Sequence, residues 1–151
     1  MEQFLPSQEL AKLLGDCDVV LTAESKGLQL GHVVARELKQ PFYAVARKAK
    51  KLYMQDGIMV SYGASITTGK AQEFYLSKHD VDVIKGKKVA IVDDVISTGE
   101  SLRATENLVE QAGGIVAGRM AVLAEGDANE RDDIITLAPL PLFNPDGTVK
   151  E

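Results

Sequence analysis

Short apolar runs that alternate with segments of helical spacing are the feature that most restricts how this chain can fold. The apolar runs of strand length lie at 19–22, 42–45, 89–92, 115–123 and 134–137. Such an alternation is typical of a parallel sheet covered by helices. We therefore expect an α/β fold, a Rossmann-like five-stranded parallel sheet flanked by helices.

Two segments between these runs have the spacing of helices. Apolar residues recur at helical intervals over 28–38, and Pro41 closes that segment before the next run, which predicts a crossover helix. A second apolar stripe covers 102–112 and ends at a glycine pair beginning with Gly113, a typical helix stop.

The remaining segments lack a sustained period. Glycine, serine and threonine are mixed with β-formers over 53–68, which predicts a flexible β-hairpin flap. The stretch 139–151 is predicted to be an extended C-terminal tail with a turn at 144–147. We expect one domain over 1–151, with a short N-terminal arm at 1–18.

Composition and charge exclude several classes of protein. The 151 residues are 45% hydrophobic and 26% charged, which is typical of globular proteins and not of disordered ones. The apolar runs are too short to span a membrane, and no secretion signal begins the chain, so we expect a cytoplasmic protein. A single cysteine, Cys17, excludes an internal disulfide, and the net charge of −5 disfavours non-specific binding of nucleic acid.

The most informative segment follows the run 89–92. Its first residues, Asp93 and Asp94, fall where a parallel strand ends, and ligand sites of open α/β sheets lie at such ends. The segment continues with Val95, Ile96, Ser97, Thr98, Gly99, Glu100 and Ser101. Because these residues include glycine and small hydroxylated side chains, backbone N–H groups can close around a phosphate at a helix N-terminus. Adjacent carboxylates suit a sugar diol and hydrated magnesium, so a phosphorylated sugar satisfies both parts of the segment.

Other readings of this segment are possible. Ser97 and Glu100 also form a capping box, with Ser97 as the N-cap, although capping does not explain the two aspartates. Receiver domains carry paired acids after a strand, but near the chain start and without a phosphate loop. An α/β nucleotide-binding domain of unrelated chemistry is a further alternative.

The segment 89–101 resembles the signature of type I phosphoribosyltransferases. In that family the acidic pair holds the ribose hydroxyls of 5-phosphoribosyl 1-pyrophosphate (PRPP), and the following loop holds its 5-phosphate. The resemblance implies the type I fold and assigns ribose and 5-phosphate binding to residues 93–101. It also implies Mg2+, held indirectly by Asp93 and Asp94.

Two more segments resemble the adenine-type branch of this family. The first comprises Ala23, Glu24, Ser25, Lys26 and Gly27, and it resembles the pyrophosphate loop. The second is a basic cluster that includes Arg47, Lys48 and Lys51, and in relatives its arginine reaches pyrophosphate, often in the neighbouring subunit. If neither segment binds a ligand, Gly27 is an ordinary turn glycine, and the basic cluster is a solvent-exposed face. The resemblance implies a homodimer, with Asp93, Asp94 and Arg47 as the catalytic residues.

The implied reaction transfers ribose 5-phosphate from PRPP to a purine base, for which adenine is favoured. Relatives that use 6-oxopurines carry an acid where Ser97 stands. However, adenine-type enzymes place a flap glutamate before a Tyr-Gly pair, whereas Ser61 precedes Tyr62 here. The alternative is therefore a non-catalytic regulatory protein of purine metabolism that binds PRPP.

The part of the protein that would cover the base is reduced in this sequence. Relatives use an N-terminal arm as a hood over the base, and only 18 residues precede the first predicted strand. Residues that could line a base pocket instead are Tyr62, Glu125, Leu142 and Phe143.

Overall fold

The computed structural model describes residues 6–64 and 71–150, with side chains described from residue 10 to 60 and from 71 onward. A five-stranded sheet forms the centre of the molecule in the order β2-β1-β5-β6-β7, and every neighbouring pair is parallel. Its strands are β1 (Val19–Ala23), β2 (Ala44–Ala46), β5 (Lys88–Ile96), β6 (Ile115–Glu125) and β7 (Ile135–Leu140). The predicted five-stranded parallel sheet is confirmed.

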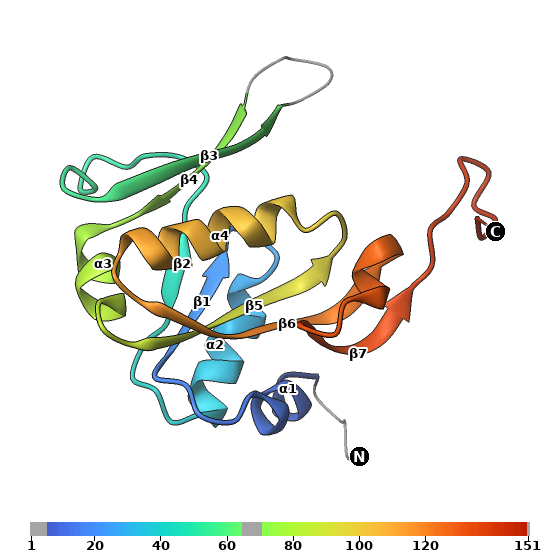
Figure 1. Cartoon of the computed structure of the whole chain (residues 1–151), viewed down its shortest axis with the longest axis horizontal. Coiled ribbons are helices and arrows are strands. Elements are labelled where there is room, and N and C mark those ends of the chain that lie inside the picture. The colour runs from blue at the N-terminus through green and yellow to red at the C-terminus, as the bar shows by residue number, and fades with distance from the viewer. Residues whose placement is uncertain (1–5, 65–70, 151) are drawn as a thin grey trace.

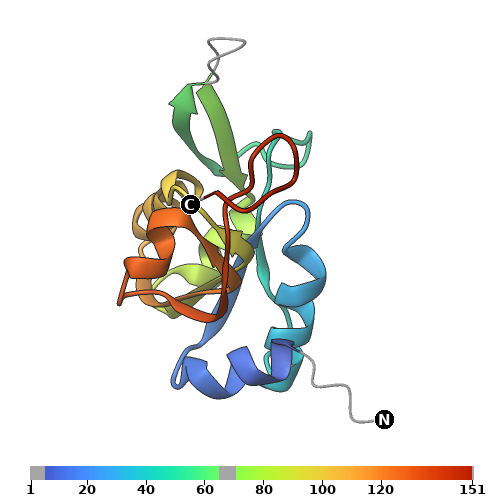
Figure 2. The ribbon, with the colours of Figure 1, turned by 90° about the vertical axis from the view of Figure 1, so that its right-hand side faces the viewer.

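Helices cover both faces of this sheet (Figures 1 and 2). They are α1 (Pro6–Leu14), α2 (Leu28–Glu37), α3 (Lys78–Ile84) and α4 (Glu100–Gln111), with a short 3-10 helix η1 (Gly126–Glu130). Figure 2 shows α1 and α2 on one side of the sheet and α4 on the other. Both predicted helices are present; α4 ends at Gln111, and Gly113, two residues further on, has a φ of 81°.

The N-terminal segment contributes to the core. We expected an arm over 1–18; residues 1–5 lie outside the described residues, and Pro6–Leu14 form α1. The side chains of Leu10 and Leu14 are buried and pack in one cluster with Val34 of α2 and Met120 of β6. Burying a leucine side chain contributes about 1.5–3 kcal/mol, which explains why this segment becomes a helix on the sheet face.

The central strand β5 is longer than its apolar run. It continues through Ile96, and its last residues pair with β6, Val95 with Leu123 and Ile96 with Ala124. The two aspartates therefore lie inside the strand and not in the loop that follows it. A run of apolar residues marks only the part of a strand that is buried on both faces, so it ends before the hydrogen bonding does.

A second, two-stranded antiparallel sheet projects from the body of the molecule (Figure 1). It consists of β3 (Ile58–Ala64) and β4 (Ala71–Leu76). The hairpin predicted at 53–68 is present, but its second strand lies beyond that range, and residues 65–68 are outside the described residues. The base of β4 is hydrogen-bonded to the segment after β2, since Arg47 and Tyr75 exchange two N–H to O bonds of 2.8 Å.

The C-terminal stretch after β7 contains the predicted turn. The N–H of Gly147, which has a φ of 86°, donates to the Asn144 carbonyl oxygen at 2.9 Å. In the two described parts of the chain, no helix has the length and apolar character needed to cross a membrane.

Candidate functional site

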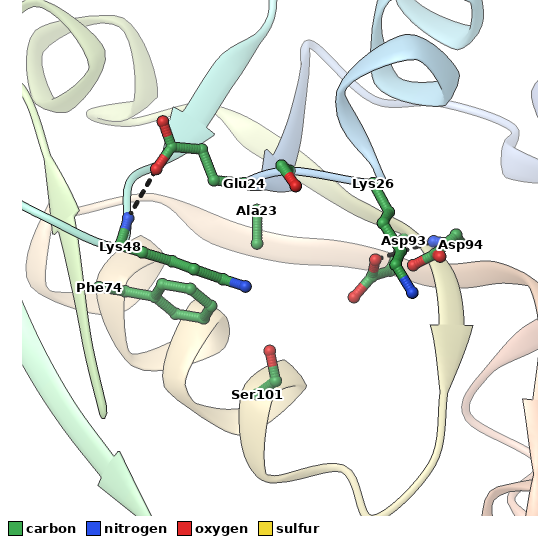
Figure 3. A pocket seen from close by; sticks show the side chains of 9 residues that line it. Ala23, Glu24, Lys26, Lys48, Phe74, Asp93, Asp94 and Ser101 are labelled. Carbon is green, nitrogen blue, oxygen red and sulfur yellow. Dashed lines mark hydrogen bonds between the residues drawn. The ribbon is translucent and has the colours of Figure 1, made fainter. Parts of the chain in front are cut away.

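A cavity of about 260 Å³ opens at the carboxyl ends of β1 and β5. Its lining residues are Ala23, Glu24, Ser25, Lys26, Lys48, Phe74, Asp93, Asp94 and Ser101. In Figure 3 the side chains of Lys48, Asp93 and Ser101 point into this space from three different elements. With the loop that contains residues 23–26, the segments at Lys48 and 93–101 make three that are distant in the sequence and meet at one edge of the sheet, where parallel α/β sheets bind ligands.

The two aspartates differ in their surroundings. Asp93 is largely withdrawn from water, and burial together with the neighbouring Asp94 carboxylate raises the pKa of Asp93 to about 7. The Asp94 N–H donates to Asp93 Oδ1 at 2.8 Å, which orients the Asp93 carboxylate. A buried carboxylate beside a second one is stabilised by hydroxyl donors or a cation, so the pair has the chemistry to bind a diol.

A second hollow of about 180 Å³ adjoins the first and shares Asp93 and Ser101 with it. Its other lining residues are Val95, Ile96, Ser97, Thr98, Gly99 and Leu102. The helix α4 begins at Glu100, and its N-cap is Gly99, with a φ of 83° and no side chain to cap the helix. Backbone N–H groups at such a helix start are donors for an anion.

The capping-box reading of this segment is wrong. Ser97 precedes the N-cap by two residues, so its hydroxyl is not in the N-cap position. The hydrogen bond at this helix start runs from the Glu100 N–H to Thr98 Oγ1, at a long 3.4 Å. Helix capping by Ser97 therefore does not explain the geometry of this loop.

The loop after β1 requires a glycine at its end. Gly27 is the N-cap of α2, and a Cβ built on it would lie 2.3 Å from Thr22 Oγ1 and 3.4 Å from Asp93 Oδ1. The Glu24–Ser25 peptide bond in this loop is cis. The absence of a side chain at Gly27 lets the loop approach the aspartates closely, so the loop 23–27 borders the segment 93–101.

The basic cluster after β2 is held against the same loop by Glu24. Arg47 Nη1 donates to Glu24 Oε1 and the Lys48 N–H donates to Glu24 Oε2, both at 2.9 Å. The Lys48 N–H, and after it the Arg47 guanidinium, lower the pKa of Glu24. Lys48 lines the cavity, whereas Lys51 is exposed and does not line it. Glu24 thereby fixes the cations beside the cavity.

The residues suggested for a base pocket are not gathered at this cavity. Glu125 ends β6, and Leu142 and Phe143 are 40% and 56% exposed in the tail. None of these three is among the residues that line the cavity. The backbone of Tyr62 is in β3, and its side chain is outside the described residues.

An aromatic residue that the sequence analysis did not consider lies in the cavity wall. Phe74 of β4 is 1% exposed and lines the cavity beside Lys48 (Figure 3). Burial alternates along β4, since Phe74 and Leu76 are buried and Glu73 and Tyr75 are partly exposed. The residue types do not alternate in the same way, because Phe74, Tyr75 and Leu76 are consecutive aromatic or apolar residues, so the sequence carried no clear strand signal here.

The donor set is compatible with a hydrated magnesium ion. Over residues 6–64 and 71–150, no cluster of three or more histidine, cysteine or acidic side chains could hold a metal. Mg2+ usually keeps several waters and takes one or two carboxylates together with substrate phosphates. Asp93 and Asp94 would supply such carboxylates, so the fit depends on a phosphorylated ligand.

Comparisons with known proteins agree with this geometry. The family profile described as "Phosphoribosyl transferase domain" matches residues 7–137. An adenine phosphoribosyltransferase of Mesomycoplasma hyopneumoniae is 36% identical over 109 residues, which are 72% of this chain and 59% of the relative. A xanthine phosphoribosyltransferase of an Exiguobacterium strain is 31% identical over 130 residues, 85% of this chain and 66% of the relative.

Solved structures give the same result at the level of the fold. The adenine phosphoribosyltransferase of Thermoanaerobacter pseudethanolicus superposes with a TM-score of 0.76 at 26% identity, covering 89% of this chain and 78% of the other. That of Rhodothermus marinus gives 0.74 at 28% identity, over 89% and 77%. The profile covers most of the chain and the site at the strand ends has the expected residues, so the chain belongs to the phosphoribosyl transferase family.

Proposed function

We propose that this protein transfers ribose 5-phosphate from PRPP to a purine base, for which adenine is favoured, and so acts as a pentosyltransferase of purine salvage. The observation that carries this proposal is the meeting of the loop 23–27, the cation Lys48 and the Asp93-Asp94 pair around one cavity. The curated relatives named above are longer than this chain, and their names supply the class of substrate.

The proposed binding mode follows from the two adjoining hollows. The 5-phosphate would occupy the hollow formed by 95–99 and Ser101, where the start of α4 offers backbone N–H groups. The ribose hydroxyls would donate to Asp93 and Asp94. The pyrophosphate would then lie between the loop 23–27 and the cations Arg47, Lys48 and Lys51.

The reaction itself needs little covalent chemistry from the chain. A base nitrogen attacks C1 of the ribose and releases its proton to water, and the bond from C1 to the pyrophosphate oxygen breaks with its electron pair on the leaving group. Asp93 and Asp94 orient the sugar, while Arg47 and the loop amides stabilise charge on the departing pyrophosphate. Bound Mg2+ would neutralise part of that charge.

The hairpin is proposed as the cover of the site. Its strand β4 contributes Phe74 to the cavity wall and is hydrogen-bonded through Tyr75 to Arg47. A cover that excludes water protects a cation-like sugar from hydrolysis.

We also propose a homodimer. Leu52 and Tyr53, which follow the basic cluster, are 93% and 65% exposed, and we propose that they contribute to its interface.

The test of this function is a panel of bases. The protein is incubated with PRPP, Mg2+ and adenine, xanthine, hypoxanthine, guanine or a pyrimidine, and released pyrophosphate is measured. We expect turnover with adenine to exceed turnover with the 6-oxopurines, because Ser97 carries no carboxylate. Preferred use of xanthine would overturn the choice of adenine while retaining the class of reaction.

The non-catalytic alternative is favoured by one observation. Ser61, and not glutamate, precedes Tyr62 in β3, so the flap carboxylate of adenine-type relatives is missing at that position. Tight PRPP binding without turnover of any base in the panel would establish the regulatory function instead.

A further inference from the structure

An arginine that the site described above does not include lies against the loop proposed to hold the 5-phosphate. A Cβ built on Gly99 would be 2.9 Å from Arg131 Nη1, so the guanidinium is in contact with the N-cap of α4. Arg131 follows η1, about thirty residues later in the chain. Arg131 lines an outer cavity that shares Thr98 and Gly99 with the hollow proposed for the 5-phosphate.

The orientation of Arg131 is imposed by a carboxylate. Its Nε donates to Asp133 Oδ1 at 2.9 Å and its Nη2 donates to Asp133 Oδ2 at 2.7 Å. This two-point pairing leaves Nη1 as the nitrogen directed at Gly99. Bidentate arginine–carboxylate pairs fix the plane of the guanidinium as well as its position.

Asp133 is itself tied to the body of the protein. Arg119 of β6 forms an ion pair with Glu106 of α4 and lies 3.9 Å from Asp133 Oδ2. Side chains of Arg119 and Glu106 are 29% and 18% exposed, so this part of the network is shielded from solvent more than a surface pair. The network therefore connects β6 and α4, through Asp133 and Arg131, to the loop at Gly99.

We propose that Arg131 is a positioning residue for the 5-phosphate loop, held by Asp133 so that its guanidinium contacts Gly99 and adds positive charge near the phosphate. This inference rests on the proposed binding of PRPP. It also gives a second reason for glycine at position 99, because any side chain there would meet the guanidinium as well as require a φ of 83°.

The test measures two partial ligands separately. Calorimetry with ribose 5-phosphate reports on the loop at 95–101, and calorimetry with pyrophosphate reports on the loop at 23–27. For Arg131→Gln we expect roughly threefold to tenfold weaker binding of ribose 5-phosphate, the range for a partly exposed charge near an anion, and unchanged binding of pyrophosphate. Equal weakening of both ligands, or of neither, would overturn the inference.

Asp133→Asn separates positioning from simple electrostatics. Removing a negative charge near a phosphate would strengthen binding if only long-range charge mattered. If Asp133 acts by holding Arg131, binding of ribose 5-phosphate weakens despite the more positive charge. Stronger binding in Asp133→Asn would contradict the positioning role.

Arg103→Gln is the matched control. Arg103 lines the same outer cavity and carries the same charge, but it is not near the Cβ position of Gly99. We expect its affinity for ribose 5-phosphate to stay within about twofold of the parent. Thermal unfolding of each variant shows whether it is folded. Arg131→Lys keeps the positive charge but cannot pair with Asp133 through two nitrogens, so we expect it to bind ribose 5-phosphate with an intermediate affinity. If the parent protein binds neither partial ligand nor PRPP, the proposed function fails and not the role of Arg131 alone.

Discussion

Asp93 is the residue at which folding and the proposed ligand site conflict. Burial beside Asp94 raises its pKa from 3.8 to about 7, so the free protein holds a group that favours its neutral form. Between pH 4 and pH 7 the folded chain binds a proton that the unfolded chain has released. The free energy of unfolding therefore falls as pH rises through this window and levels off above it.

Asp93→Asn should remove this pH-dependent loss. Asparagine keeps an oxygen to accept the Asp94 N–H but carries no charge to bury. At pH 8 we expect the ligand-free variant to be more stable than the parent by at least about 1 kcal/mol, since one pKa unit corresponds to about 1.4 kcal/mol. Near pH 4 we expect the two proteins to have equal free energies of unfolding. Urea unfolding at both pH values measures the difference.

An exposed aspartate provides the control for this experiment. Asp56→Asn, in the turn before β3, should leave the stability at pH 8 unchanged. An Asp93→Asn variant that is less stable than the parent at pH 8 would show that the ionised carboxylate is satisfied in the free protein, contrary to the burial described above.

At the scale of elements, the junction of β1 and α2 depends on the fit between Thr22 and Gly27. Gly27→Ala would place a methyl group 2.3 Å from Thr22 Oγ1, a fully buried atom. Overpacking of this kind costs about 1–3 kcal/mol, and here it would also displace the loop from the aspartates. Urea unfolding should show this loss, and it should be smaller when Thr22→Ala removes the hydroxyl that causes the clash. Equal costs in both backgrounds would mean that the two residues are not coupled.

The elements also show what the sequence could and could not predict. Strands β1 and β5 were predictable because their apolar runs are buried between helices, and α4 because its stripe is long. The strand β4 and helix α3 were missed, since six and seven residues give too few periods to distinguish them from loops. Local motifs predicted a ligand site at 23–27 and 93–101, and both segments border the cavities at the sheet edge. Phe74 and Arg131 carry no motif, and only the folded chain brings Phe74 to the cavity wall and Arg131 to Gly99.

At the scale of the whole molecule, one sheet edge gathers segments that are far apart in the sequence. The tip of β1, the segment after β2 and the tip of β5 converge because neighbouring parallel strands end on the same side. Glu24 connects the first two segments and Gly27 brings the first close to the third. The central claim is that this edge binds a phosphorylated pentose through the two aspartates.

Calorimetric titration of the protein with PRPP in the presence of Mg2+ tests that claim most directly. We expect the parent protein to bind one PRPP per chain and the Asp93→Asn, Asp94→Asn double variant to lose at least about a hundredfold in affinity while unfolding cooperatively, because two acceptors of the ribose hydroxyls are removed. Equal affinity of parent and double variant, or no binding by the folded parent, would contradict the account.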